Sequence, residues 1–204
     1  MIRSWASDQA KAVFEGHTPK GFPADLARKT RRLLAQLNAA VAVEDMRLPP
    51  GNRLHALSGD RAGQWSVSVN DQFRITFVWG AADRKMSGLA TITRGAIMSE
   101  TLDYAAFASA LPHPGEILRE EYLAPLSLSP GALAKAMGLK DRTRIERLVR
   151  EAQPVTPDTA LRLARVFSTS AQYWMNLQAQ HDLSKAAIAT RAEMAAIRPL
   201  NSAA

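Results

Sequence analysis

The stretch SPGALAKAMGLKDRTRIERLVR, residues 129–150, predicts two short helices joined by a turn. Apolar residues recur at helical spacing in both segments, and Gly138 ends the first helix. These apolar residues are Leu133, Ala134, Met137 and Leu139 in the first segment, and Ile145, Leu148 and Val149 in the second. Because the side chain of Ala134 is small, the two helices can approach each other closely. The stretch therefore favours a helix-turn-helix unit.

The second of these helices keeps its polar and charged residues outside. A helix of this kind can enter the major groove of DNA, where arginine reads guanine edges and threonine or arginine contacts phosphate. We expect the DNA-binding residues to be Lys140, Arg142, Thr143, Arg144, Glu146, Arg147 and Arg150. An ordinary pair of antiparallel helices with a solvated charged face is the alternative.

The composition narrows the class of protein. The chain has 204 residues, 47% of them hydrophobic, which is enough to bury a core and to form one or two domains. The absence of cysteine excludes disulfides, cysteine-based zinc sites and thiol catalysis. Since no run of about 18 apolar residues and no signal-like N-terminus is present, we expect a cytoplasmic protein without membrane contact.

The charge is basic and unevenly distributed. The formal net charge is +7 and the sequence pI is about 10.1, which favours nucleic acid as a partner. Residues 1–98 hold 14 basic and 8 acidic residues, whereas residues 99–204 hold 12 and 11. This difference in charge indicates two structural units with different roles.

The first half predicts helices packed on one side of an antiparallel sheet. Ile2–Trp5 is expected to form a first strand, and residues 22–41 a helix with Pro23 in its first turn. The basic residues of this helix, 28–32, form either a solvated face or a contact with RNA or the ribosome.

The clearest strands alternate apolar and polar residues over 65–69 and 73–79. A three-residue loop between them pairs Val69 with Phe73 and Val67 with Ile75, and keeps the apolar side chains on one face. Arg74 then lies on the polar face, beside the hydroxyl side chains of the two strands.

The second half predicts a compact all-α domain. The expected helices cover residues 114–123, 130–137, 141–151, 157–167, 170–180 and 182–196. Residues 80–112 show little periodicity before Tyr104. We expect an α+β domain over 1–97, a junction over 98–111 and a helix-turn-helix domain over 112–204.

Two further stretches make the helix-turn-helix half similar to a known family. They are HPGEILREEYL, residues 113–123, and TPDTALRLARVFSTSAQYWMNLQAQHDL, residues 156–183. Together with the helix-turn-helix they resemble the HigA antitoxins, which belong to the Cro/phage-repressor-like group. The resemblance implies a homodimer that binds operator DNA and represses its own gene. Where that family has an Asn-Gly-Lys/Arg turn, this chain has Arg150–Gln153, which puts the turn and one phosphate contact in question.

The first half is similar to HigB, the partner toxin of HigA, which has a RelE/ParE-like fold. The resemblance lies in PPGNRLHALSGDRAGQWSVSVNDQFRITFVW, residues 49–79. It implies a ribosome-dependent mRNA endonuclease with catalytic residues His55 and Arg74, acting without cofactor or metal. Ser58 stands where the family often has lysine, and Thr91–Thr93 stand where it closes with Asp-Tyr-His.

The chain thus resembles a toxin and its antitoxin fused into one polypeptide, with the two halves in contact. A frameshift ahead of about residue 86 would account for the altered tail, and Met98 would be the ancestral antitoxin start. We expect DNA binding to survive and the nuclease to be impaired. The alternative is an active mRNA endonuclease, binding ribosome and mRNA, that the antitoxin half inhibits in cis.

Overall fold

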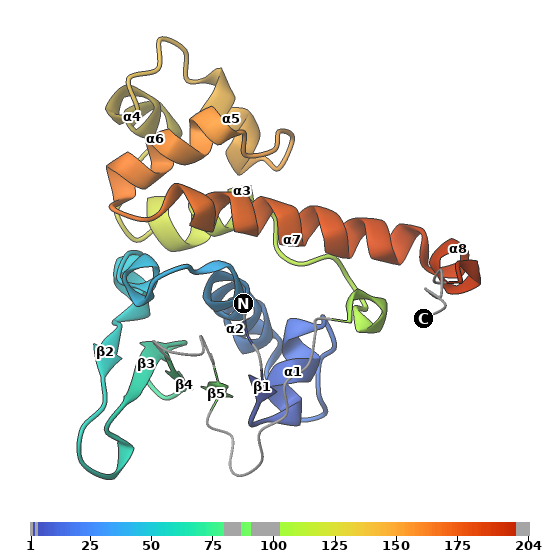
Figure 1. Cartoon of the computed structure of the whole chain (residues 1–204). Coiled ribbons are helices and arrows are strands. Elements are labelled where there is room, and N and C mark those ends of the chain that lie inside the picture. The colour runs from blue at the N-terminus through green and yellow to red at the C-terminus, as the bar shows by residue number, and fades with distance from the viewer. Residues whose placement is uncertain (1, 3, 80–86, 91–102, 199–204) are drawn as a thin grey trace, which may run out of the picture.

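The first half of the chain is a mixed five-stranded sheet with helices against it (Figure 1). The computed structural model describes residues 2, 4–79, 87–90 and 103–198. The strand order is β1-β5-β4-β3-β2. The strands are β1 (Ser4–Trp5), β2 (His55–Ala56), β3 (Gln64–Ser68), β4 (Arg74–Val78) and β5 (Ser87–Ala90).

The β3–β4 hairpin has the register that the alternating pattern predicts. Val67 lies opposite Ile75, and Val69 N donates to the carbonyl of Phe73 at 2.9 Å. Val67, Val69 and Ile75 are buried, but Phe73, expected to face the core, is 42% exposed at the hairpin end.

The expectation of a purely antiparallel sheet is wrong at one edge. The strand β1 pairs in parallel with β5, through Ser4 opposite Ser87 and Trp5 opposite Gly88. A parallel pair needs a long connection between its strands. Here that connection is most of the first half, so the local sequence pattern does not reveal it.

Helices α1 (Asp8–Phe14) and α2 (Ala24–Ala39) pack together beside the sheet (Figure 1). The observed α2 is two residues shorter at each end than the expected helix, and Pro23 is its N-cap rather than part of its first turn. Phe14, Leu33 and Leu37 are at most 1% exposed. Three short 3-10 turns, Val43–Met46, Pro50–Asn52 and Gly59–Arg61, connect α2 to the hairpin.

The second half is helical from Pro114 onward. Its helices are α3 (Pro114–Ile117), continued by a π-helical segment (Leu118–Leu123), α4 (Pro130–Ala136), α5 (Thr143–Val149), α6 (Pro157–Phe167), α7 (Ala171–Ala189) and α8 (Arg191–Ala196). A 3-10 turn, Tyr104–Ala106, precedes them. The expected break between residues 180 and 182 is wrong, because α7 runs through it without interruption.

The two halves share one continuous apolar core and a set of buried polar contacts. The helix α2 lies against α7, where Asn38 Nδ2 donates to Gln180 Oε1 at 2.7 Å. Asp45 accepts hydrogen bonds from the backbone N and the hydroxyl of Ser170, the N-cap of α7. Each half therefore supplies groups that the other half needs in order to satisfy its buried polar atoms.

Among the residues that the structure describes, no helix is long and apolar enough to cross a membrane.

Candidate nucleic-acid interface

Helices α4 and α5 form the helix-turn-helix that the sequence predicts. The hydroxyl of Ser129 caps α4 by accepting from Ala132 N at 3.1 Å, and Gly138 takes a positive φ of 69° where the helix has ended. The carboxylate of Asp141 accepts from Thr143 N at 2.9 Å and from its hydroxyl at 2.8 Å. These hydrogen bonds lower the pKa of Asp141 and fix the first turn of α5.

The inner face of α5 is anchored in the core. Ile145 and Leu148 are fully buried, and Val149 is 8% exposed. On α3, Gly115 faces the backbone of α5 so closely that a Cβ there would collide with the carbonyl oxygen of Leu148. This close approach presses α5 against α3 and turns its other face outward.

The predicted DNA-binding cations fall into two groups. Lys140, Arg147 and Arg150 are exposed, and within the described residues they have no ion-pair partner. Arg142 and Arg144 are each paired with a carboxylate: Arg142 Nε lies 2.9 Å from Glu146 Oε1, and Arg144 Nη1 contacts Asp158 Oδ2.

Asp158, near the start of α6, is a residue that the sequence analysis missed. Its carboxylate accepts from Arg144 and also from Arg162 Nε, at 3.0 and 3.1 Å for its two oxygens. The hydrogen bond from Arg144, followed by that from Arg162, lowers the pKa of Asp158. The i,i+4 spacing of Asp158 and Arg162 is visible in the sequence, whereas the contact with α5 depends on how the helices pack.

The turn after α5 keeps a left-handed backbone although it lacks a glycine. Glu151 has a φ of 62°, which glycine adopts at little cost and glutamate does not. Its Oε1 lies 3.2 Å from Arg119 Nη1, and Arg119 also donates to the carbonyl of Val149. The added carboxylate therefore pairs with an arginine of the same half.

In the first half, the side chain of His55, on the edge strand β2, meets that of Arg74, the first residue of β4. Arg74 Nε donates to Ser66 Oγ at 2.7 Å, and its Nη2 lies 3.1 Å from His55 Nδ1. The same Nδ1 lies 3.0 Å from the carbonyl oxygen of Arg53.

These two contacts of His55 Nδ1 require different tautomers. A guanidinium only donates, so Nδ1 must be unprotonated to accept from Arg74, and protonated to donate to the carbonyl of Arg53. In the second tautomer, Nε2 of the exposed ring carries the lone pair that a general base needs. The substituted tail, Thr91–Thr93, lies outside the described residues.

The basic stretch 28–32 of α2 is not uniformly solvated. Arg31 donates to the carbonyl of Phe14 and to Ser109, and Arg32 Nε lies 2.6 Å from Glu121 Oε1. Glu121 is 3% exposed, so its pair with Arg32 is a buried contact between the two halves. Only the outer residues of this stretch, Arg28 foremost, remain open to solvent.

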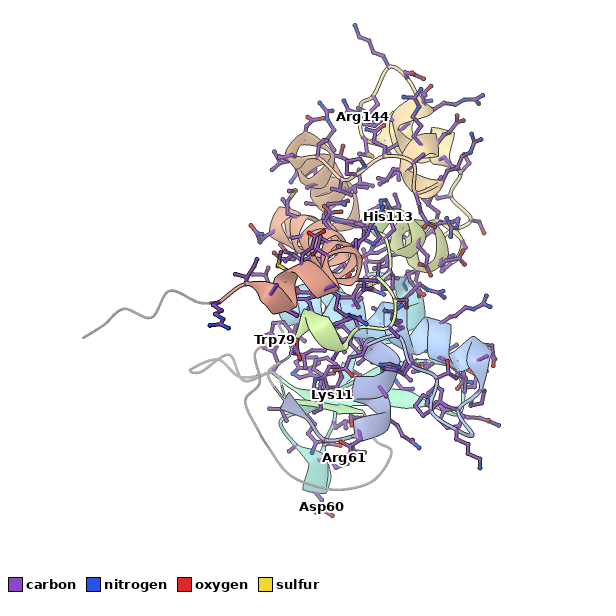
Figure 2. The ribbon with its side chains drawn as sticks, turned by 90° about the vertical axis from the view of Figure 1, so that its right-hand side faces the viewer. Lys11, Asp60, Arg61, Trp79, His113 and Arg144 are labelled. Atoms are coloured by element: carbon purple, nitrogen blue, oxygen red, sulfur yellow. The ribbon has the colours of Figure 1, made fainter. Side chains whose placement is uncertain are left out.

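The helix-turn-helix and the edge of the sheet lie at opposite ends of the molecule. Figure 2 shows Arg144 near one end and Arg61 near the other, with His113 between them. Arg61 belongs to the polar face of the sheet, because its Nη2 donates to Thr76 Oγ1 at 2.9 Å. Within the described residues, no three His, Asp or Glu side chains gather in a way that could hold a metal ion.

Comparisons with known proteins assign both halves. Residues 3–87 match the family model described as the RelE-like toxin of the type II toxin-antitoxin system HigB. Over 77 residues the chain is 32% identical to the endoribonuclease HigB of Proteus vulgaris. The matched region covers 38% of this chain and 83% of that protein. Over this half, the chain belongs to the HigB toxin family.

The rest of the chain is similar to helix-turn-helix regulators and to a HigA antitoxin. The chain is 55% identical over 74 residues to virulence-associated protein I of Dichelobacter nodosus, a match that covers 36% of this chain and 68% of that protein. The Pseudomonas aeruginosa antitoxin HigA, solved with the higBA promoter, is 43% identical over 44% of this chain and 97% of its own, with a TM-score of 0.42. Several curated helix-turn-helix regulators are matched over only 61–64% of their length. The antitoxin HigA-1 of Vibrio cholerae is 33% identical to the chain over 69 residues, so one polypeptide contains a half similar to HigB and a half similar to HigA.

Proposed function

We propose that this chain is a sequence-specific DNA-binding protein that represses its own gene. The proposal divides it into a HigB-like domain over 1–97, a junction over 98–111 and a HigA-like domain over 112–204. The observation that carries it is the outward surface of α5 and the turn before it, where Lys140, Arg147 and Arg150 are exposed and unpaired within the described residues. Relatives named as helix-turn-helix transcriptional regulators support it.

The geometry suits a recognition helix in the major groove. The first residues of such a helix contact base edges, and Thr143 and Arg144 hold that place in α5. The three unpaired cations then neutralise phosphates on either side of the groove. A homodimer would set two copies of α5 one helical turn of DNA apart, so that the operator consists of two half-sites.

The role of the unpaired cations can be tested with one-charge variants. Arg147→Ala is expected to weaken binding to the DNA upstream of the gene several-fold and to reduce the salt dependence of log K by about one ion. The matched control is Lys185→Ala, which removes one exposed charge from α7 and should change affinity less than about twofold. Fluorescence anisotropy over a salt series measures both. Equal effects of the two variants would contradict the placement of α5.

We further propose that the nuclease chemistry of the HigB-like half is impaired. Two features support this: Ser58 offers no cation near the scissile phosphate, and Arg31 and Arg32 are engaged by groups of the second half. The alternative, an active mRNA endonuclease restrained in cis, is favoured by the exposed His55 beside Arg74. It would bind ribosome and mRNA.

Expression of residues 1–98 alone distinguishes the two. We expect normal growth and intact mRNA with this fragment, as with the full chain, once circular dichroism has shown that the fragment is folded. Growth arrest with cleaved mRNA, abolished by His55→Ala, would establish the alternative. The His55 variant is the control because it separates cleavage from mere toxicity of the fragment.

A further inference from the structure

The side chain of Arg144 is positioned by a contact within the protein itself. It is the second residue of α5, and its Nη1 donates to Asp158 Oδ2 on α6. Its side chain is 38% exposed, whereas that of Arg142, the N-cap of α5 two residues earlier, is 71% exposed. The carboxylate of Asp158 therefore confines a side chain that would otherwise sample many rotamers.

Asp158 is itself fixed by a second arginine. Arg162 Nε lies 3.0 and 3.1 Å from the two oxygens of Asp158, and Arg162 Nη1 donates to the carbonyl of Met137 at 2.7 Å. Met137 is the C-cap of α4. The contacts thus connect the end of α4 to the start of α6 and from there to the start of α5.

One edge of the Arg144 guanidinium stays available. Its hydrogen bond to Asp158 uses Nη1, and within the described residues neither Nε nor Nη2 makes a hydrogen bond. These two nitrogens form a planar pair of donors, the arrangement that matches O6 and N7 of guanine in the major groove. A guanidinium whose orientation is already fixed by another hydrogen bond loses less conformational entropy when it binds a base.

We propose that Asp158 is a positioning residue that orients Arg144 to read a guanine in each half-site of the operator. The inference rests on the proposed DNA binding. Asp158 touches no base; it acts through Arg144, and its negative charge near the groove also repels phosphate. Removal of the carboxylate should therefore have two opposite effects: discrimination at one base falls, while affinity for DNA of unrelated sequence rises.

The experiment selects binding sites from a library of random 20-bp duplexes with the full chain at fixed salt. Arg144→Ala identifies the position that Arg144 reads, as the base pair in each half-site whose preference disappears. Asp158→Asn is expected to lose most of the guanine preference at that same position, of the order of tenfold, and to bind a shuffled duplex more tightly than the wild type does. Asp158→Ala, which leaves no hydrogen-bond acceptor for Arg144, should do the same.

The matched control is Glu120→Gln. It removes one carboxylate that pairs with an arginine outside α5, since Arg119 Nε lies 2.9 Å from Glu120 Oε1. It should leave the preference at the Arg144 position unchanged. Thermal unfolding checks that all variants are folded, which the exposure of Asp158 favours.

The outcomes separate the two proposals. An enriched motif whose guanine preference survives both Asp158 variants overturns the positioning role and leaves DNA recognition intact. A fall in affinity for both specific and shuffled DNA in the Asp158 variants, with the motif unchanged, would assign Asp158 a merely structural role and also overturns the inference. Failure of the wild type to enrich any motif overturns the proposed function, and the role of Asp158 with it.

Discussion

At the scale of single residues, the turn after α5 shows how a departure from the family pattern is accommodated. Glu151 occupies a left-handed backbone conformation, and its carboxylate pairs with Arg119. Glu151→Ala and Glu151→Gly both remove that exposed ion pair, which is worth about 0.2–1 kcal/mol. They differ in the backbone alone: glycine relieves a strain of about 1 kcal/mol that alanine keeps. We therefore expect Glu151→Gly to be more stable than Glu151→Ala by about 1 kcal/mol in urea unfolding. Equal stability of the two variants, or a more stable alanine variant, would show that the turn is not strained.

At the scale of elements, local patterns predict what local chemistry determines. The register of Val67 opposite Ile75 follows from alternation within the hairpin, and the α4–turn–α5 unit follows from the spacing of its apolar residues. The parallel pairing of β1 with β5 does not follow from any local pattern, because the two strands are far apart in the sequence. The helix α7 continues through residues 180–182 because no glycine or proline interrupts it there, and because Gln180 and His181 each bond to distant backbone carbonyls.

In the candidate site too, local sequence patterns predict some features, while others depend on how the helices pack. Which cations lie on the outer face of α5 was predictable from the helical period. Which of them are neutralised was not, since Asp158 reaches Arg144 from another helix. Nothing in the sequence indicates that Arg31 and Arg32 are engaged by the second half, because their partners Ser109 and Glu121 lie 78 and 89 residues further along.

At the scale of the whole molecule, the two halves are one folded unit with its two candidate nucleic-acid surfaces at opposite ends (Figure 2). At the interface between the halves α2 packs against α7, and Arg32 of α2 pairs there with Glu116 of α3 and with the buried Glu121. Removal of one partner of such a pair leaves a buried charge that costs about 3–5 kcal/mol. The HigB-like half is therefore a structural support for the HigA-like half, whatever chemistry it retains. The helix α5 lies away from this interface, so the proposed binding of DNA does not require the halves to separate.

The most direct test of the central claim is a footprint of the full chain on the DNA immediately upstream of its own gene. A repressor that reads two half-sites should protect one site of two segments, centred about 10–10.5 bp apart, against cleavage at a protein concentration that leaves a shuffled segment unprotected. Uniform protection of both DNAs, or none of either, would contradict sequence-specific binding by α5 and with it the proposed function.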